Sequence, residues 1–129
     1  MLTLPGPVVT VDWLQAHHSD PSLRIADVRW SLNPPPGRER YAAGHLPGAI
    51  FLDLGADGCF LDPDALRARY AGLGAGERPT IVYCGSGTTA AHDLLAMELA
   101  GIPGGLLYEG SWSDWSSDPR RPAATGPTP

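Results

Sequence analysis

The sequence has no lysine, and its 129 residues include only two cysteines, two phenylalanines and two methionines. Without lysine, the chain cannot form the glycine–lysine pair of a nucleotide-binding P-loop. Two cysteines are too few for the disulfide framework of a small secreted domain, so we expect two thiols rather than a bridge. No segment approaches the roughly twenty apolar residues of a membrane span. The start, MLTLPGPVVT, also lacks the basic segment and long apolar core of a signal peptide, which predicts a cytoplasmic protein without membrane contact.

The charge balance is acidic, with nine arginines against 14 aspartates and glutamates and a formal net charge of −5. Nucleic acid and anionic membrane surfaces are therefore not expected as partners, because the densest basic cluster is only the pair Arg120 and Arg121. A chain of this length with 43% hydrophobic residues fits one soluble domain around one core.

Short apolar runs alternate with helical segments, which predicts an α/β fold with a mostly parallel sheet of about five strands and helices on both faces. The expected strands are 7–10, 23–29, 49–53, 80–83 and 106–108. The expected helices are 11–17, 62–70 and 88–100, with a turn or short helix at 110–115. Three consecutive prolines predict an extended loop over 33–37, because proline cannot donate ladder hydrogen bonds.

The stretch YCGSGTTA at 83–90 lies between the clearest strand and the longest helix, at the end of the sheet where α/β folds bind ligands. Gly85 and Gly87 permit positive φ, so successive N–H groups can point inward beside the positive end of the helix. Such a field stabilises a thiolate and makes Cys84 a nucleophile. Hydroxyls of Ser86, Thr88 and Thr89 would either bond to a bound anion or cap the helix. From the residues alone, a buried apolar thiol is an equally weighted alternative.

Three motifs in this order, GHLPGA at 44–49, CGSGTTA at 84–90 and GSWSDW at 110–115, resemble the rhodanese-type sulfurtransferases. The resemblance runs from about Ile25 to Gly126. It implies a single rhodanese-like three-layer domain over 1–129, in which 119–129 form an irregular tail. The loop is similar to that of the 3-mercaptopyruvate sulfurtransferases, whereas members that prefer thiosulfate more often have a basic residue after the cysteine. Gly85 therefore favours mercaptopyruvate, and a thiosulfate preference stays open.

The resemblance implies a double displacement through a persulfide on Cys84. The thiolate would take sulfur from 3-mercaptopyruvate or thiosulfate and pass it to a thiol such as reduced thioredoxin, or to cyanide. Backbone N–H groups from Gly85 to Thr89 would stabilise the anionic sulfur, and Ser86 would bond to the donor. No metal or organic cofactor is implied. Phosphatase relatives need an arginine six residues after the cysteine, where this chain has Ala90.

The donor's carboxylate needs a cation, and similarity to the family's substrate arginines points to Arg29 and Arg38. The alternative for each is a solvated surface charge, at equal weight. Asp27 is expected to be a structural acceptor that orients Arg29. The family usually has a second substrate arginine four residues after this one, where the present chain has Asn33.

For the other polar and aromatic residues, a structural role is expected rather than a catalytic one. His45 is expected to hydrogen-bond locally at a helix end rather than to act as a general acid. Cys59 is expected to be a plain thiol rather than one that resolves a persulfide. Trp112 and Trp115 are expected to pack the wall of the site.

Proteins with this loop type usually have two such domains in tandem, with the site in the cleft between them. One domain alone would expose Cys84 to solvent unless a homodimer or the proline-rich tail covers it. Two hypotheses follow: a small sulfurtransferase, or a persulfide carrier in a sulfur relay that receives sulfur from a partner protein and turns over free donors poorly. An enzymatically silent interaction domain is disfavoured, because the cysteine loop is intact.

Overall fold

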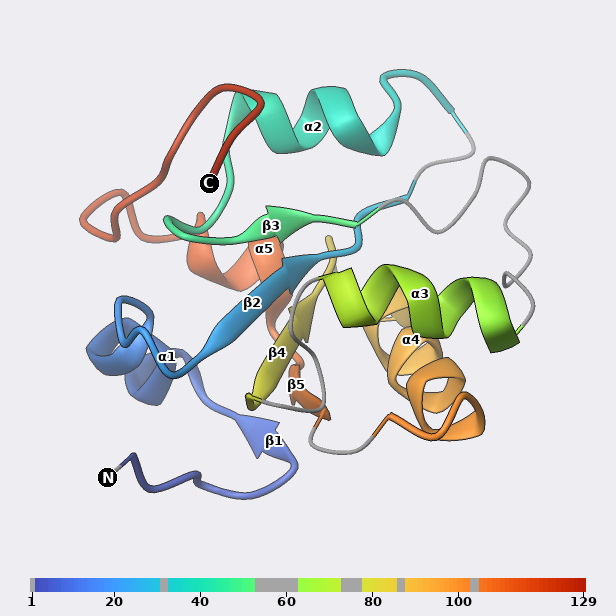
Figure 1. The fold of residues 1–129 in the computed structure, drawn as a ribbon. Helices are drawn as coiled ribbons and strands as arrows, with labels where there is room; N and C mark the ends of the chain where they lie inside the picture. Colours follow the sequence, from blue (N-terminus) through green and yellow to red (C-terminus); the bar gives the residue numbers. More distant parts are fainter. Residues whose placement is uncertain (1, 31–32, 53–62, 73–77, 86–87, 103–104) are drawn as a thin grey trace.

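The computed structural model describes residues 2–30, 33–52, 63–72, 78–85, 88–102 and 105–129, apart from the side chains of residues 63, 66 and 88. Within these ranges the chain forms a five-stranded sheet in which every strand pairing is parallel (Figure 1). The strands are β1 (Val8–Val9), β2 (Arg24–Asp27), β3 (Ile50–Phe51), β4 (Thr80–Tyr83) and β5 (Gly105–Tyr108), in the order β1-β5-β4-β2-β3. The predicted α/β fold is therefore confirmed.

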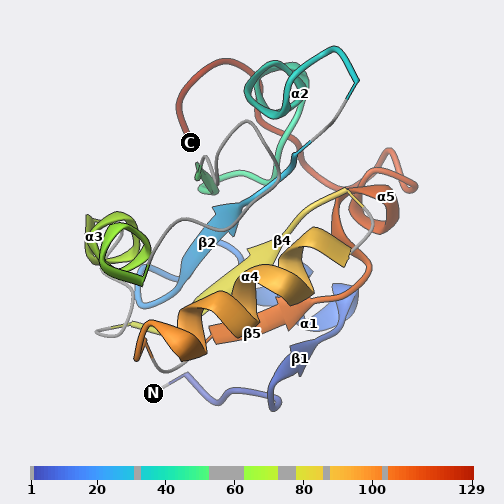
Figure 2. The same ribbon diagram turned by 90° about the vertical axis from the view of Figure 1, so that its right-hand side faces the viewer.

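Helices cover both faces of this sheet (Figure 2). They are α1 (Val11–His17), α2 (Gly37–Ala43), α3 (Pro63–Gly72), α4 (Thr88–Leu99) and α5 (Ser111–Trp115). Helices α3 and α4 lie on one face, α1 and α5 lie on the other, and α2 lies above β3 in the view of Figure 1. Across the described ranges, each helix is too short or too polar to cross a membrane.

Two apolar clusters fill the space between sheet and helices, and the strands divide their side chains between them. Along β4, Ile81 and Tyr83 belong to the cluster that includes α1 and α5. Val82 and the following Cys84 belong to the cluster under α3 and α4. Successive side chains of a strand point to opposite faces, so this period of two carries Cys84 to the side of α4. Every residue of β4 is buried, as expected for a strand in the middle of a sheet covered on both faces.

Helix α2 follows the predicted loop over 33–37 and lies outside the predicted helix ranges, although His45 was expected at a helix end. The helix begins at Gly37, and Pro36 is its N-cap in an extended conformation. A Cβ atom at position 37 would overlap the backbone oxygen of Arg29. Glycine therefore lets the first turn of α2 lie directly on the chain that leaves β2, a tertiary contact that residue patterns do not reveal.

Strand β2 is also shorter than the predicted strand 23–29. The ladder ends at Asp27, and the N–H of Arg29 donates to the Asp27 carboxylate, with 3.0 Å between nitrogen and Oδ1. The chain therefore leaves the sheet after Asp27, where the Asp27 carboxylate rather than a neighbouring strand accepts the N–H of Arg29.

Residues 119–129 pack against α2. The only regular secondary structure in this described segment is an isolated antiparallel bridge between Ala124 and His45. Both backbone hydrogen bonds of this bridge are 2.9 Å long, and the N–H of Gly126 donates to the oxygen of Ala42 at 2.8 Å. The indole Nε1 of Trp115 donates to the oxygen of Pro122 at 2.8 Å. Figure 1 shows this segment returning beside α2.

Candidate active site

Cys84 directly follows β4 and is only 2% exposed. The backbone N–H of Ala90, the third residue of α4, donates to its sulfur, with 3.4 Å between nitrogen and Sγ. The amino-terminal end of a helix carries a partial positive charge, so this N–H group and the helix itself both favour a negative charge on the sulfur. The strand and the helix predicted on either side of the loop therefore place the Cys84 sulfur in an anion-stabilising position.

Cys84 is buried within the single chain, whereas one domain was expected to expose it unless a homodimer or the proline-rich tail covers it. The N–H of Trp112 donates to the carbonyl oxygen of Cys84, and the N–H of Ser113 donates to that of Gly85, both at 2.9 Å. The first turn of α5 is therefore bonded to the end of β4, and one chain alone encloses the sulfur.

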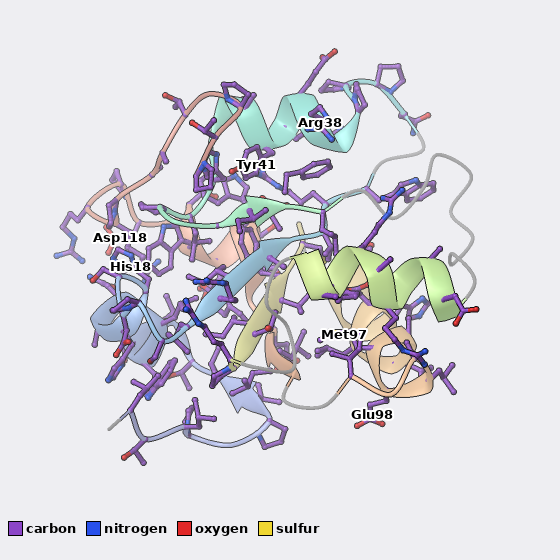
Figure 3. The ribbon with its side chains drawn as sticks, viewed as in Figure 1. His18, Arg38, Tyr41, Met97, Glu98 and Asp118 are labelled. Carbon is purple, nitrogen blue, oxygen red and sulfur yellow. The ribbon has the colours of Figure 1, made fainter. Side chains whose placement is uncertain are left out.

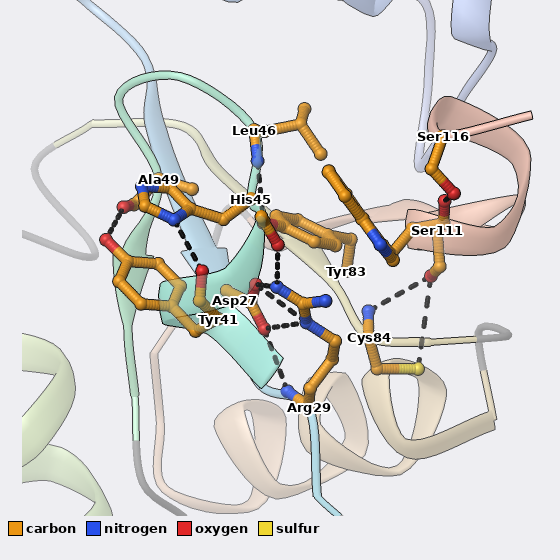
Figure 4. Close-up of polar contacts among 12 residues, drawn as sticks. Asp27, Arg29, Tyr41, His45, Leu46, Ala49, Tyr83, Cys84, Ser111 and Ser116 are labelled. Atoms are coloured by element: carbon orange, nitrogen blue, oxygen red, sulfur yellow. Dashed lines mark hydrogen bonds and ion pairs between the residues drawn. The ribbon is translucent and has the colours of Figure 1, made fainter. Parts of the chain in front are cut away.

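Ser111 is a residue of the site that the sequence analysis does not single out. Its Oγ accepts the N–H of Cys84 at 3.0 Å and lies 3.9 Å from the Cys84 Sγ (Figure 4). The same hydroxyl donates to the oxygen of Tyr108 at 2.9 Å. The motif GSWSDW draws attention first to its tryptophans. No local pattern predicts that Ser111 contacts Cys84, 27 positions earlier. The GlySer pair before Trp112 is the only feature of the sequence that could have pointed to this serine.

Arg29 is 7% exposed and is bound to Asp27 in the sheet. Its Nη2 lies 2.8 Å from Asp27 Oδ2, its Nε donates to both oxygens of that carboxylate, and Nη2 also donates to the oxygen of Gly44 at 2.6 Å. The prediction that Asp27 orients Arg29 is confirmed. The guanidinium carbon lies 5.0 Å from the centre of a Trp112 ring, so this tryptophan packs beside the site as expected.

The remaining nitrogen of Arg29, Nη1, has no hydrogen-bond partner within the described ranges. It is the part of this guanidinium that can still meet a ligand. Substrate binding by Arg29 stays a prediction.

The model of the family described as "Rhodanese-like domain" matches residues 10–118. The chain belongs to the rhodanese family. A Pseudomonas aeruginosa relative named "Probable 3-mercaptopyruvate sulfurtransferase" is 47% identical in a match that covers 88% of this chain and 43% of the relative. The 3-mercaptopyruvate sulfurtransferase of Escherichia coli K12 is 38% identical over 125 residues, with the same two coverages. This rhodanese chain thus spans less than half the length of these curated relatives.

Solved structures share the fold of this rhodanese domain. The structure of an EanB variant in complex with hercynine has a TM-score of 0.78 at 22% identity, over 93% of this chain and 32% of that one. The anaerobic ergothioneine biosynthesis enzyme from Chlorobium limicola has a TM-score of 0.74 at 25% identity, over 95% of this chain and 32% of that one. The first of these likenesses shows the fold alone.

The GHLPGA segment of this rhodanese domain is fixed to the end of β4 by Tyr83. The N–H of Leu46 donates to the Tyr83 hydroxyl oxygen at 3.1 Å. Burial is the main cause that raises the pKa of Tyr83 well above its ordinary value, and the carboxylate of Asp27 adds to it. The hydroxyl therefore stays protonated and links GHLPGA to the strand that carries Cys84.

His45 forms the local hydrogen bond predicted for it. Its Nδ1 lies 2.8 Å from the oxygen of Tyr41, so Nδ1 carries the proton, because a carbonyl oxygen only accepts. The imidazole is fully buried and stacks on the Tyr41 ring with 3.7 Å between centroids. Its Nε2 has no partner in the described part of the chain. This position is that of a packed structural residue.

Arg38 lies on the first turn of α2 and is exposed (Figure 3). Its guanidinium carbon is 4.9 Å from the centre of the Phe51 ring. Hydrogen bonds and ion pairs to Arg38 are absent among the described residues, so its donors are available to a ligand. Contact with the substrate stays a prediction.

Three predicted site positions lie outside what is described: Ser86, Gly87 and the side chain of Thr88. Cys59, which is expected to be a plain thiol, also lies outside it. Gly85 and Thr89 are described and partly buried, and their contact with a donor stays a prediction. The described residues contain no group of three or more histidine, cysteine, aspartate or glutamate side chains that could hold a metal ion.

Proposed function

We propose that this rhodanese domain is a sulfurtransferase that moves a sulfane sulfur from 3-mercaptopyruvate or thiosulfate, through a persulfide on Cys84, to a thiol or cyanide. The observation that supports it most is the setting of Cys84, a thiol enclosed at the carboxyl end of a central parallel strand with the Ala90 N–H donating to its sulfur. A nucleophilic cysteine needs such a donor, because its reactive form is the thiolate.

In the first half of the reaction, the Cys84 thiolate attacks the sulfur of the donor. With mercaptopyruvate, a sulfur–sulfur bond forms and the carbon–sulfur bond breaks, and the electron pair leaves on pyruvate as an enolate that takes up a proton. In the second half, the thiolate of an acceptor attacks the outer sulfur. The bond to Cys84 breaks, and its electron pair returns to Sγ, where the N–H of Ala90 stabilises it.

Mercaptopyruvate is the favoured donor because Gly85 follows the cysteine and because the Escherichia coli relative is named a 3-mercaptopyruvate sulfurtransferase. A mouse relative, 38% identical over 78 residues, is named a thiosulfate sulfurtransferase, so both donors belong in the test. The small size of both suits an enclosed sulfur. Reduced thioredoxin is the proposed protein acceptor.

The decisive experiment measures the mass of the reduced protein and of its Cys84 peptide after incubation with each donor separately. We expect a gain of one sulfur, about 32 Da, on the Cys84 peptide with mercaptopyruvate. A gain with thiosulfate alone would keep the mechanism and overturn the donor preference. No gain with either donor would contradict the proposed enzyme.

A persulfide carrier is the second candidate function, and the pairing of Arg29 favours it. Asp27 and the oxygen of Gly44 occupy Nε and Nη2 of Arg29, and Asn33 stands where the family usually has a further arginine. Fewer cations for a small anionic donor would weaken turnover of free donors. A carrier would gain sulfur from a persulfide-bearing protein and not from the two small donors.

Replacing Arg38 by alanine should raise the apparent KM for mercaptopyruvate by about tenfold or more, because one charge-assisted hydrogen bond to the donor carboxylate is lost. Steady-state kinetics with mercaptopyruvate would measure this change, and alkylation by neutral iodoacetamide should proceed at the wild-type rate. Arg69→Ala, on the exposed side of α3, removes the same charge and serves as the control. An equal loss with both reagents would mean that Arg38 supports the fold instead.

A further inference from the structure

Ser111 adopts a backbone conformation that serine rarely takes. Its φ is +55°, and it is the only residue other than glycine with positive φ in the described ranges. Glycine would adopt this conformation without strain, so a fully buried serine here calls for a reason in its side chain.

The reason lies in the three contacts of its hydroxyl group. A hydroxyl has one hydrogen to donate and two lone pairs to accept with. One lone pair accepts the N–H of Cys84, at 3.0 Å. The single hydrogen can point to the oxygen of Tyr108, 2.9 Å away, or to the Cys84 sulfur, 3.9 Å away. The oxygen of Tyr108 is the nearer acceptor as long as the sulfur carries its own proton.

We propose that the Ser111 hydroxyl is a catalytic donor to Cys84, which turns its hydrogen from the oxygen of Tyr108 to the sulfur when the sulfur becomes a thiolate. A hydrogen bond to an ionised group is stronger than one to a neutral carbonyl, so ionisation supplies the preference for the sulfur. This inference deepens the proposed function, since it rests on Cys84 as the reacting thiol. Together with the N–H of Ala90, the hydroxyl gives the thiolate two donors from different elements.

The same donor acts in the step that releases sulfur to the acceptor. When the sulfur–sulfur bond breaks, the electron pair moves onto the Cys84 Sγ, and Ser111 donates to the charge as it forms. In the persulfide the charge lies on the outer sulfur instead, so the hydroxyl can return to the oxygen of Tyr108. The hydroxyl therefore favours the thiolate over the persulfide and helps Cys84 to leave.

The surrounding backbone holds Ser111 at this distance. Its neighbours Trp112 and Ser113 donate their N–H groups to the oxygens of Cys84 and Gly85, both at 2.9 Å. The two residues that follow Ser111 therefore fix its turn to the end of β4, and only the hydrogen has to move.

The test measures alkylation of Cys84 by iodoacetamide between pH 5 and pH 10 in Ser111→Ala and Ser111→Gly, read from the mass of the Cys84 peptide. Only the thiolate reacts, so loss of one donor should slow alkylation about tenfold at pH 6 and leave the rate at pH 10 within about twofold of wild type. The matched control is Ser116→Ala, which removes a hydroxyl of the α5 region that donates to the oxygen of Trp112 and not to sulfur.

A wild-type pH profile in a folded Ser111→Gly protein would overturn the proposal, and so would an equal slowing at every pH, which indicates altered access instead. If the Ser111→Ala protein fails to fold, Ser111→Gly still allows the measurement, because glycine adopts positive φ without strain. Alkylation needs no sulfur donor. The two proposals can therefore fail separately. If the pH profile of alkylation shifts in the Ser111 variants but the wild type gains no sulfur, the result contradicts sulfurtransferase activity and still supports Ser111 as a donor to the Cys84 thiolate.

Discussion

Replacing Asp93 by asparagine should raise the free energy of unfolding by about 4 kcal/mol at pH 8 and change it little at pH 4. Asp93 lies in α4 on the helix face that packs against the sheet, in line with Ala90 and Met97. The residue is fully buried, and both oxygens of its carboxylate lack a partner in the described part of the protein. Burial raises the pKa of Asp93 from its ordinary 3.8 to about 7.

The direction of the effect follows from proton binding. Between about pH 4 and pH 7 the folded protein keeps the proton on Asp93 while the unfolded chain releases it, so stability falls as the pH rises through this window. Above pH 7 the folded protein carries a buried, unpaired carboxylate. The buried hydroxyl of Tyr70, on the neighbouring α3, likewise has no partner among the described residues. Asparagine cannot ionise, so the variant has no buried, unpaired charge at position 93 above pH 7. The free-energy cost of burying that charge is therefore removed at high pH.

Urea unfolding of wild type and Asp93→Asn at several pH values from 4 to 8 would measure the difference. The control is Asp12→Asn, because Asp12 is exposed on α1 and its replacement should leave the pH dependence as in wild type. Parallel stability curves for wild type and Asp93→Asn would show that the Asp93 carboxylate finds a partner or reaches water.

Replacing Cys84 by serine should abolish the gain of sulfur and lower sulfur transfer by about a thousandfold or more. Serine has nearly the shape of cysteine, but its hydroxyl is not ionised at neutral pH and cannot form a persulfide. Mass spectrometry after incubation with each donor and a cyanide or dithiol transfer assay would measure the two losses. The serine hydroxyl can accept the N–H of Ala90 as the sulfur does, so the unfolding midpoint should change little.

Cys59→Ser is the matched control, because it removes the other thiol of the chain and should keep both activities. Sulfur gain retained in Cys84→Ser and lost in Cys59→Ser would move the chemistry to Cys59. That outcome would contradict the proposal that Cys84, after β4, is the nucleophile.

The sheet and the cysteine loop could be predicted from sequence because their signals are local. Every residue of the run ThrIleValTyr is buried, and a short, nearly continuous apolar run is the local signal of a strand covered on both faces. The alanine-rich segment after it forms α4 as expected. Helix α2 could not be predicted in this way, since its first turn depends on how closely Gly37 approaches the Arg29 backbone.

The site could be predicted only in part, because some of its contacts join segments that lie far apart in the sequence. Cys84 stands out by its position after a strand, whereas the contact of Ser111 with it joins segments 27 residues apart. The pairing of Asp27 with Arg29 was within reach, because residues two apart in an extended chain share a face. The burial of Cys84 could not be predicted, since it depends on the hydrogen bonds that the first turn of α5 makes with the end of β4.

The hydrogen bonds of the last residues extend the folding unit past the segment that the family shares. The family match ends at residue 118, but the partners of Trp115 Nε1 and of the His45 backbone are Pro122 and Ala124. A protein shortened to residue 118 would leave the indole N–H of Trp115 and the backbone groups of His45 unpaired. Boundaries for domain swaps, fusions or grafts of this protein therefore belong after Gly126, eight residues beyond the shared segment.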